Sequence, residues 1–341
     1  MEKDKRLNVN KDIRLQHKVI NIGKALGGFC LFILAVSLIS FALMYFSPAD
    51  PIATFMRTRA SGMSEAQRAA LVQQWGLDKG FLQRWAIWIG RAATGDFGTS
   101  QIYNRSVGEV IAQAASSSLP LFFISWFLSG ILGVILGIVS GNKGSKLADK
   151  LICGLSMIVS ATPGFWIAIL LISVFSIQLG LFPFGLSGPL GVQTWEISIT
   201  DRIYHMVLPC LCLIIVATPE VALHTRAKVI TTLNSDYMFY AQTKGVKSSD
   251  LIRRCGMKNI IFPALTLQLA NVCELISAMV VIESAFSYPG LGRICVSAAL
   301  GNDVPLLLCA TLIVATFVYW ANVLARRLTE KLDPRIGDSY E

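Results

Sequence analysis

Charged residues are scarce in this sequence, and their scarcity is the first guide to its class. Only 15% of the 341 residues are Asp, Glu, Lys or Arg, whereas a soluble domain carries about 25%. Hydrophobic residues make up 54% of the chain. The run from Ala25 to Phe46 is long enough for a membrane-spanning helix, which needs roughly 20 apolar residues. It is too long, and too poor in small residues at its end, for a cleaved signal peptide. The sequence therefore predicts an integral membrane protein.

Motifs that carry chemistry are also lacking. A phosphate-binding loop needs Gly-x-x-x-x-Gly-Lys-Ser/Thr, and residues 137–145 contain glycine, lysine and serine in a different order. We therefore expect this chain not to hydrolyse ATP. Gly-x-Ser-x-Gly, His-Glu-x-x-His and paired intramembrane Asp residues are absent as well, which argues against an intramembrane enzyme. We expect no catalytic residue, no metal site and no cofactor in this chain.

The eight cysteines form no Cys-x-x-Cys pair and lie mostly in apolar runs, where a free cysteine packs as a small hydrophobe. The net charge of +9 comes from basic residues at the ends of those runs. This distribution is typical of membrane topology and not of nucleic-acid binding. The expected surroundings are a lipid bilayer, with no nucleic acid among the partners.

The apolar runs predict an all-α membrane protein with six transmembrane helices. The spans are 23–46, 117–140, 151–177, 204–224, 259–286 and 304–325. Lysine and arginine gather in the tails 1–22 and 326–341 and in the loops after the second and fourth spans. Positive residues favour the cytoplasm, so both termini are expected there. The core then occupies 117–325, with a cytoplasmic coupling loop at 227–258, and the segment 47–116 is extracytoplasmic.

The extracytoplasmic segment is expected to contain helices of its own. One helix is predicted to open at Ser64 and to end near Gly76, a residue suited to a left-handed cap. The stretch from Phe81 to Ile89 reads as a second, amphipathic helix, and it carries Trp85 and Trp88. Such aromatics rest at bilayer interfaces, so we expect a small helical segment on the outer leaflet.

Two patterns within the spans bear on packing. Gly133, Gly137 and Gly141 are spaced four apart in the second span, and small residues at this spacing let helices approach closely in lipid. Pro163-Gly164 interrupts the third span and predicts a kink or break. Such a break either lines a cavity or is a locally tolerated kink.

The stretch between spans four and five is the most informative one. Asn234, Ser235 or Asp236 can cap a short helix, and Gly245 can end it with a positive φ. Ser248 or Ser249 can cap a second helix. This pattern predicts two short cytoplasmic helices at an angle, joined by a glycine; we call Asp236 to Lys258 the coupling segment.

This segment resembles the loop by which ABC importer permeases dock onto their ATPase subunits. The family has a Glu-Ala-Ala-like triplet, then a glycine, then Ile/Leu-x-Pro. The matching residues here are Tyr240-Ala241-Gln242, Gly245 and Ile261-Phe262-Pro263. Further matches to the family are Ser47-Pro48-Ala49-Asp50-Pro51, Gly95-Asp96-Phe97-Gly98-Thr99-Ser100, the run from Glu283 to Arg293, and Leu332-Asp333-Pro334-Arg335. The triplet lacks its glutamate, Ala49 replaces glycine, and Thr243 replaces alanine.

From about residue 20 to its end, the chain is similar to the dipeptide, oligopeptide and nickel permease family, in the first-subunit branch. The resemblance implies a peptide permease of a bacterial or archaeal inner membrane. It implies a second homologous permease, two ATP-binding subunits that hold ATP and Mg, and an extracytoplasmic substrate-binding protein as partners. Nickel or a metal chelate is the alternative substrate. An autonomous secondary transporter would show inverted repeats and discontinuous helices, and neither is evident in the sequence.

Two groups of site residues follow from the motifs. The ATPase-coupling group comprises Asp236, Tyr240, Ala241, Gln242, Lys244, Gly245, Arg253, Arg254 and Pro263, with Pro263 expected to start the fifth span. The candidates for the pathway or outer gate are Glu274, Glu283, Pro289, Gly290 and Gly292.

Several alternatives stay open for the second group. Glu274 either lines the pathway or makes a helix contact, and Pro219-Glu220 is an alternative holder of the cytoplasmic gate. Glu283 either pairs with Arg293 or caps the turn that follows. That turn either touches the binding protein or is an ordinary connection between helices.

Overall fold

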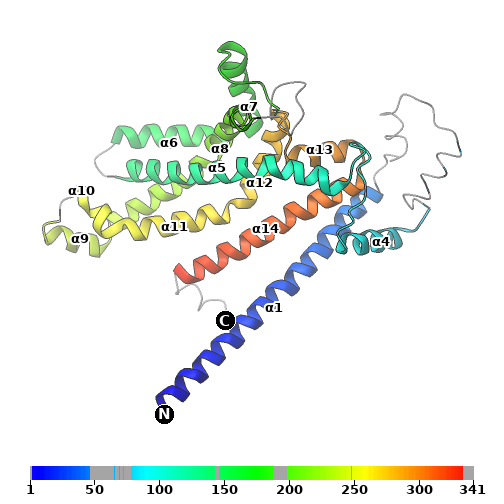
Figure 1. Cartoon of the computed structure of the whole chain (residues 1–341). Helices are drawn as coiled ribbons and strands as arrows, with labels where there is room; N and C mark the ends of the chain where they lie inside the picture. Colours follow the sequence, from blue (N-terminus) through cyan, green and yellow to red (C-terminus); the bar gives the residue numbers. More distant parts are fainter. Residues whose placement is uncertain are drawn as a thin grey trace. The chain divides into compact units, whose positions relative to one another are not determined.

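The computed structural model describes residues 2–46, 78–142, 146–186, 198–246 and 248–332, together with positions 65, 69 and 72. Within these residues the chain is nearly all helical and has no strand; one isolated bridge joins Thr99 to Ser106. The expected all-α class is therefore confirmed (Figure 1). The chain divides into two units, one within Met1–Val107 and Gly301–Val323, the other within Gly108–Leu300 and Leu324–Glu341.

The first unit contains α1 (Glu2–Tyr45), α4 (Phe81–Ala93) and most of α14 (Val304–Leu332). The helix α4 is amphipathic, as predicted, and its aromatic face packs on α1. The Phe41 and Phe81 rings lie 5.6 Å apart, and the Trp85 indole donates to Ser37 Oγ at 3.2 Å. Trp85, expected at a bilayer interface, thus satisfies its N–H within the protein. Of the helix predicted from Ser64, only Glu65, Ala69 and Val72 are described, and all three are helical. The motifs at 47–51 and 333–335 lie outside the described residues.

The motif Gly95-Asp96-Phe97-Gly98-Thr99-Ser100 forms a turn whose end packs against the residue that precedes α14, Asp303. Gly95 and Gly98 take positive φ values of 85° and 82°, which only glycine adopts readily. The fully buried Asp303 carboxylate accepts from Ser100 Oγ at 2.5 Å and from the Ile102 backbone N–H at 3.1 Å. Its other oxygen accepts from the Leu306 N–H at 3.2 Å and caps α14. This motif therefore has a structural role.

The second unit is a helical bundle. Its elements are α5 (Val107–Gly141), α6 (Lys146–Ala161), α7 (Gly164–Leu171), the π-helix η1 (Ile172–Gln178), α8 (Ile199–Leu233), α9 (Asp236–Thr243), α10 (Ser248–Leu251), the π-helix η2 (Ile252–Gly256), α11 (Met257–Ala270), α12 (Val272–Ala285) and α13 (Leu291–Leu300).

Glycines spaced four apart bring α5 against α8. Each glycine faces one residue of α8, and the pairs are Gly133 with Val221, Gly137 with Thr225, and Gly141 with Val229. A Cβ added to any of the three would lie between 2.5 and 2.7 Å from the Cβ of its partner, well inside van der Waals contact. The packing predicted from the spacing is confirmed.

In the part of the chain that the structure describes, four helices are long and apolar enough to cross a membrane: Ala25–Tyr45, Val107–Gly141, Ile199–Leu233 and Val304–Leu328. Two bent helix pairs raise the number to six if each pair is one span. The first pair, Lys146–Ala161 and Gly164–Gln178, bends by 105°, and the break predicted at Pro163-Gly164 is confirmed.

The second bent pair corrects a prediction. Ile252–Ala270 and Val272–Ala285 meet at 51°, so the fifth span is not the continuous helix expected over 259–286. The break is at Asn271, whose φ of −82° and ψ of 9° lie in the bridge region. No proline or glycine lies at this position, so no local residue pattern predicted the break. Among the described residues, helices are thus interrupted at two places, of which the sequence predicted only the one at Pro163-Gly164.

Two boundaries also differ from the prediction. The helix α5 begins at Val107, so residues 107–116 belong to it and not to the expected extracytoplasmic segment. The helix α8 continues to Leu233, into the expected coupling loop 227–258. Hydropathy locates only the apolar part of a helix, and polar turns that continue beyond it leave no signal of that kind.

Candidate functional site

The coupling segment starts directly after α8. Its first helix, α9, follows Ser235, whose hydroxyl donates to the Thr232 carbonyl at 2.6 Å and does not cap α9. At the other end of α9 the backbone N–H of Gly245 donates to the Gln242 carbonyl at 2.9 Å. Gly245 has a φ of +85°, so the positive φ predicted for this residue is confirmed.

A small hydrophobic core of its own holds the coupling segment. Met238 of α9 is fully buried. It belongs to a cluster with Val229, Leu233, Leu251, Ile252 and Ile260. A Cβ on Gly256 would lie 2.6 Å from Met238 Cε, so a glycine lets η2 approach α9. The predicted residue Ala241 is half-buried against this cluster. The angle between α9 and α8 is therefore fixed by packing.

The opposite face of α9 is open. The side chains of Tyr237, Phe239 and Tyr240 are 42%, 69% and 62% exposed. Lys244 Nζ lies 5.4 Å from the centre of the Tyr240 ring. Exposed aromatic side chains grouped in this way mark contact surfaces.

The remaining coupling residues apart from Pro263 lie on α9, on the turn after it and on η2. Asp236 is the first residue of α9, and Gln242 is exposed near its end. Arg253 and Arg254 are exposed on η2, and Arg254 pairs with Asp250 at 3.3 Å. The structure thus brings together eight of the nine predicted coupling residues.

Pro263 is the exception. The second coupling helix is not a separate element, because α10, η2 and α11 follow one another without a gap from Ser248 to Ala270. Pro263 lies inside α11 and does not start the fifth span. Proline removes one backbone donor, yet the helix continues through it. A displacement at α10 would therefore pass along one rod as far as Asn271.

Glu283 of α12 is fully buried and organises the turn that follows α12. Its carboxylate accepts from Ser118 Oγ at 2.5 Å and from the Gly292 N–H at 2.7 Å. Ser118 Oγ in turn accepts from the Leu291 N–H at 2.7 Å. The Glu283 carboxyl group thus caps the N-terminus of α13, where backbone N–H groups lack partners within the helix. The Arg293 guanidinium donates to the Ser287 carbonyl, so the predicted ion pair with Glu283 is wrong and the cap is the correct alternative.

The glycines of this turn allow close approach. A Cβ on Gly290 would overlap the Glu283 carboxylate, and one on Gly292 would lie 2.5 Å from Val280 Cα. Burial, with the Glu283 charge adding to it, raises the pKa of Tyr288 to about 12. Its hydroxyl therefore stays protonated at neutral pH. The turn from Tyr288 to Gly292, with Pro289 within it, is a packed cap. Its role as an outer gate stays a prediction.

Glu274 of α12 lies at a cavity of about 340 Å³. Glu220 of α8 lines the same cavity, and the two carboxyl groups interact. Trp126 and Gln268 fix the wall beside them: the Trp126 indole donates to the Gln268 carbonyl at 2.9 Å, and Gln268 Nε2 donates to the Trp126 carbonyl at 2.6 Å. The two residues predicted as alternatives, Glu220 and Glu274, therefore belong to one site.

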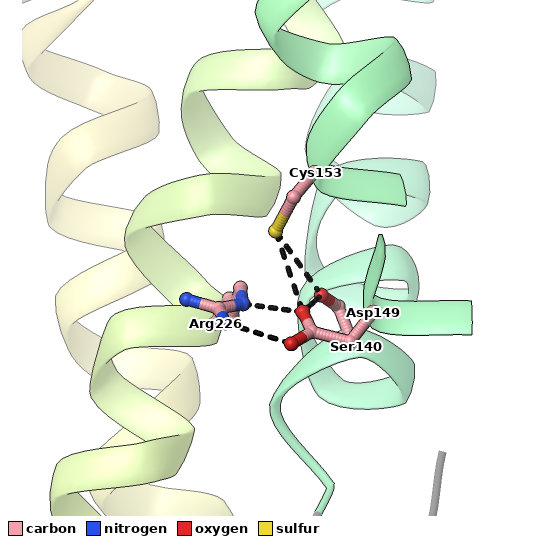
Figure 2. Close-up of polar contacts among 4 residues, drawn as sticks. All are labelled: Ser140, Asp149, Cys153 and Arg226. Carbon is pink, nitrogen blue, oxygen red and sulfur yellow. Dashed lines mark hydrogen bonds and ion pairs between the residues drawn. The ribbon is translucent and has the colours of Figure 1, made fainter. Parts of the chain in front are cut away.

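Sequence reasoning missed a polar cluster that joins three helices (Figure 2). Arg226 of α8 forms a two-pronged ion pair with Asp149 of α6, with Nε to Oδ1 at 2.5 Å and the second nitrogen to Oδ2 at 2.8 Å. Ser140 of α5 donates to the same carboxylate at 2.5 Å, and the Cys153 thiol donates to it at 3.3 Å. A single carboxylate among lysines at the start of a span was the available signal.

Comparisons with known proteins show the family to which the chain belongs. Residues 133–338 match the family described as binding-protein-dependent transport system inner membrane component. The chain is 32% identical over 307 residues to the oligopeptide transport system permease protein AppB of Bacillus subtilis, which covers 89% of this chain and 95% of that protein. It is 29% identical over 314 residues to the glutathione transport system permease protein GsiC of Escherichia coli K12, covering 92% and 97%.

The chain therefore belongs to the family of binding-protein-dependent inner-membrane transport components. It is a permease subunit of an ABC importer and a multi-pass protein of the inner membrane.

Proposed function

We propose that this chain is the first of two homologous permease subunits that together form a pathway for di- or oligopeptides. Peptide arrives from an extracytoplasmic binding protein, and two ATP-binding subunits dock on the cytoplasmic side. ATP and Mg are held by those subunits. The names of the relatives, an oligopeptide and a glutathione permease, support a peptide as substrate.

One observation carries the coupling role: α9 presents exposed aromatic side chains on one side, and a buried hydrophobic cluster holds its other side. Met238 anchors the helix inside, while Phe239 and Tyr240 face outward. A partner that binds this face moves α9 together with the residues that share its core. Because Ile252 and Ile260 belong to that core, the displacement reaches α11. Lys244, Arg253 and Arg254 add charge around the face, each worth about 0–1 kcal/mol if exposed.

The proposed orientation follows from the basic residues in the segments that flank the spans. Lys244, Arg253 and Arg254 lie in the coupling segment, and the N-terminal tail 1–22 is also rich in lysine and arginine. Positive residues stay in the cytoplasm. Both termini are therefore placed there, with 47–116 outside.

Reconstitution in liposomes tests this function. The complete complex of both permeases, both ATP-binding subunits and the binding protein is supplied with radiolabelled trialanine. We expect uptake that requires ATP and stops when the ATP-binding subunits are replaced by hydrolysis-dead variants. Accumulation that persists with the dead subunits would overturn the proposal. Nickel uptake without peptide uptake would favour the metal alternative.

A further inference from the structure

Two cavities follow one another along the same helices. The first is the cavity at Glu220 and Glu274. The second, of about 620 Å³, lies between the last turns of α8, the start of α9 and one side of α11 along its whole length. One face of α8 lines both, with Ala217 and Glu220 at the first cavity and His224 and Lys228 at the second. These positions recur every three or four residues, which is the spacing of a single helix face. We call the pair of cavities the α8 groove.

The charges in the α8 groove are separated by sign. Among the described residues, the first cavity is lined by two carboxylates and no lysine or arginine. The second is lined by Lys228, Lys258 and His224 and by no carboxylate. Neither lysine forms an ion pair within the described part of the chain. Within the described part of the chain, neither the two carboxyl groups nor the two lysines have a partner of opposite charge.

Each end favours a ligand of opposite sign. Two carboxylates placed side by side repel one another, and a cation between them relieves the repulsion. Lysine ammonium groups in a cavity favour an anion and form strong hydrogen bonds with a carboxylate. Beside them Asn259 Nδ2 donates to the Tyr237 hydroxyl at 2.7 Å. The Asn259 carbonyl oxygen is left to accept from a peptide N–H.

The separation of the two ends matches a short peptide. Glu220 and Lys228 are eight residues apart on α8, a distance of about 12 Å at 1.5 Å per residue. An extended peptide rises about 3.3–3.6 Å per residue, so three or four residues cover this span. Peptides with free ends carry an ammonium at one end and a carboxylate at the other.

We propose that the α8 groove binds a short peptide by both of its charged ends, with the ammonium at Glu220 and Glu274 and the carboxylate at Lys228 and Lys258. This inference rests on the proposed function and specifies which groups of the peptide the permease itself recognises. A lipid phosphate would engage the lysines alone and leave the two carboxylates without a counter-charge. The peptide is therefore the occupant that satisfies both ends.

Protection of an introduced cysteine tests the proposal in the assembled transporter without nucleotide, held in phosphatidylcholine nanodiscs. Ala217→Cys places a thiol in the first cavity, and peptide mapping by mass spectrometry follows its alkylation apart from the native cysteines. The probes are trialanine, N-acetyl-trialanine and trialanine amide. We expect trialanine to protect at concentrations about tenfold lower than either blocked peptide, since hydrogen bonds to charged groups carry such a factor.

Charge variants separate the two ends. The penalty of a blocked end is the ratio of the concentration at which the blocked peptide protects to that at which trialanine protects. In Glu274→Gln the penalty of the N-acetyl group should fall below about threefold, while the penalty of the amide stays near tenfold. In Lys258→Gln the penalty of the amide should fall and that of the N-acetyl group should stay. Glu220→Gln serves if Glu274→Gln does not assemble. Glu109→Gln and Lys150→Gln, exposed positions outside the groove, are the matched controls and should leave both penalties unchanged.

Three results would overturn the inference. One is equal protection by all three probes, or by none. Another is the loss of both penalties together in either variant, which would indicate a general distortion. The third is loss of trialanine protection when phosphatidylglycerol is added, which would assign the basic end to lipid. ATP-dependent peptide uptake combined with any of these results would leave the proposed function standing and sink this inference alone.

Discussion

Gly245 offers a clean test of the coupling mechanism, because a side chain there meets nothing. Its φ is +85°, and a Cβ built on it has no atom within 4 Å. Any effect of substitution therefore comes from the backbone and not from a clash. A left-handed residue costs about 1–2 kcal/mol when it carries a Cβ, and strained positions of this kind cost about 1–3 kcal/mol. Asparagine tolerates the region best among the other residues.

A graded series follows for the affinity of the ATP-binding subunits. Since 1.4 kcal/mol is a factor of ten, Gly245→Val should weaken their binding by about 5- to 150-fold. The affinity of Gly245→Ala should lie between those of Gly245→Val and wild type, and the affinity of Gly245→Asn should be closest to wild type. The measurement is binding of purified ATP-binding subunits to the permease pair in nanodiscs.

The control is Gly154→Val in α6. That glycine also has open space around its Cβ, but its backbone is helical. The control should bind the ATP-binding subunits like wild type. If Gly245→Val also binds like wild type, or if Gly154→Val is equally impaired, the argument from positive φ is refuted.

The remaining predictions concern stability and topology. Glu283→Ala leaves the backbone N–H groups of Gly292 and Arg293 and the Ser118 hydroxyl without their acceptor and should destabilise the complex by more than about 2 kcal/mol; an unchanged melting temperature would contradict the cap. Asp149→Asn and Arg226→Gln should show a coupling energy of about 1–2 kcal/mol in a double-mutant cycle, and simple additivity would mean that the pair contributes nothing. Ser64→Cys, in a cysteine-free background, should react with an impermeant maleimide from outside intact cells; labelling only after permeabilisation would reverse the topology.

Composition and periodicity were sufficient for much of the fold. Long runs without charge placed the spans, because burial of a charge in lipid is costly wherever it occurs. The glycines at 133, 137 and 141 predicted a close helix contact, and Pro163-Gly164 predicted a break, since both effects depend on local backbone chemistry. The sequence did not predict the break at Asn271, where a residue of ordinary φ/ψ freedom is held in the bridge region.

Local sequence also placed most of the coupling segment. Gly245 and the residues around it were found because a helix end and a left-handed glycine are properties of a few consecutive residues. The second coupling helix was predicted to be a separate element. In the structure it continues into α11, because the packing of Ile252 and Ile260 on Met238 holds the chain helical through η2.

The sequence by itself determined the class of this protein, its spans and its coupling segment, because each is written in neighbouring residues. Only the tertiary structure decided which distant residues meet. Glu283 pairs with Ser118, and Asp149 with Arg226, across separations that no periodic pattern encodes. The position of Glu220 beside Glu274 depends in the same way on the crossing of α8 with the bent pair α11 and α12. A carboxylate in a span requires a polar partner, but its position in the sequence does not identify that partner. The tertiary fold determines which residue it contacts.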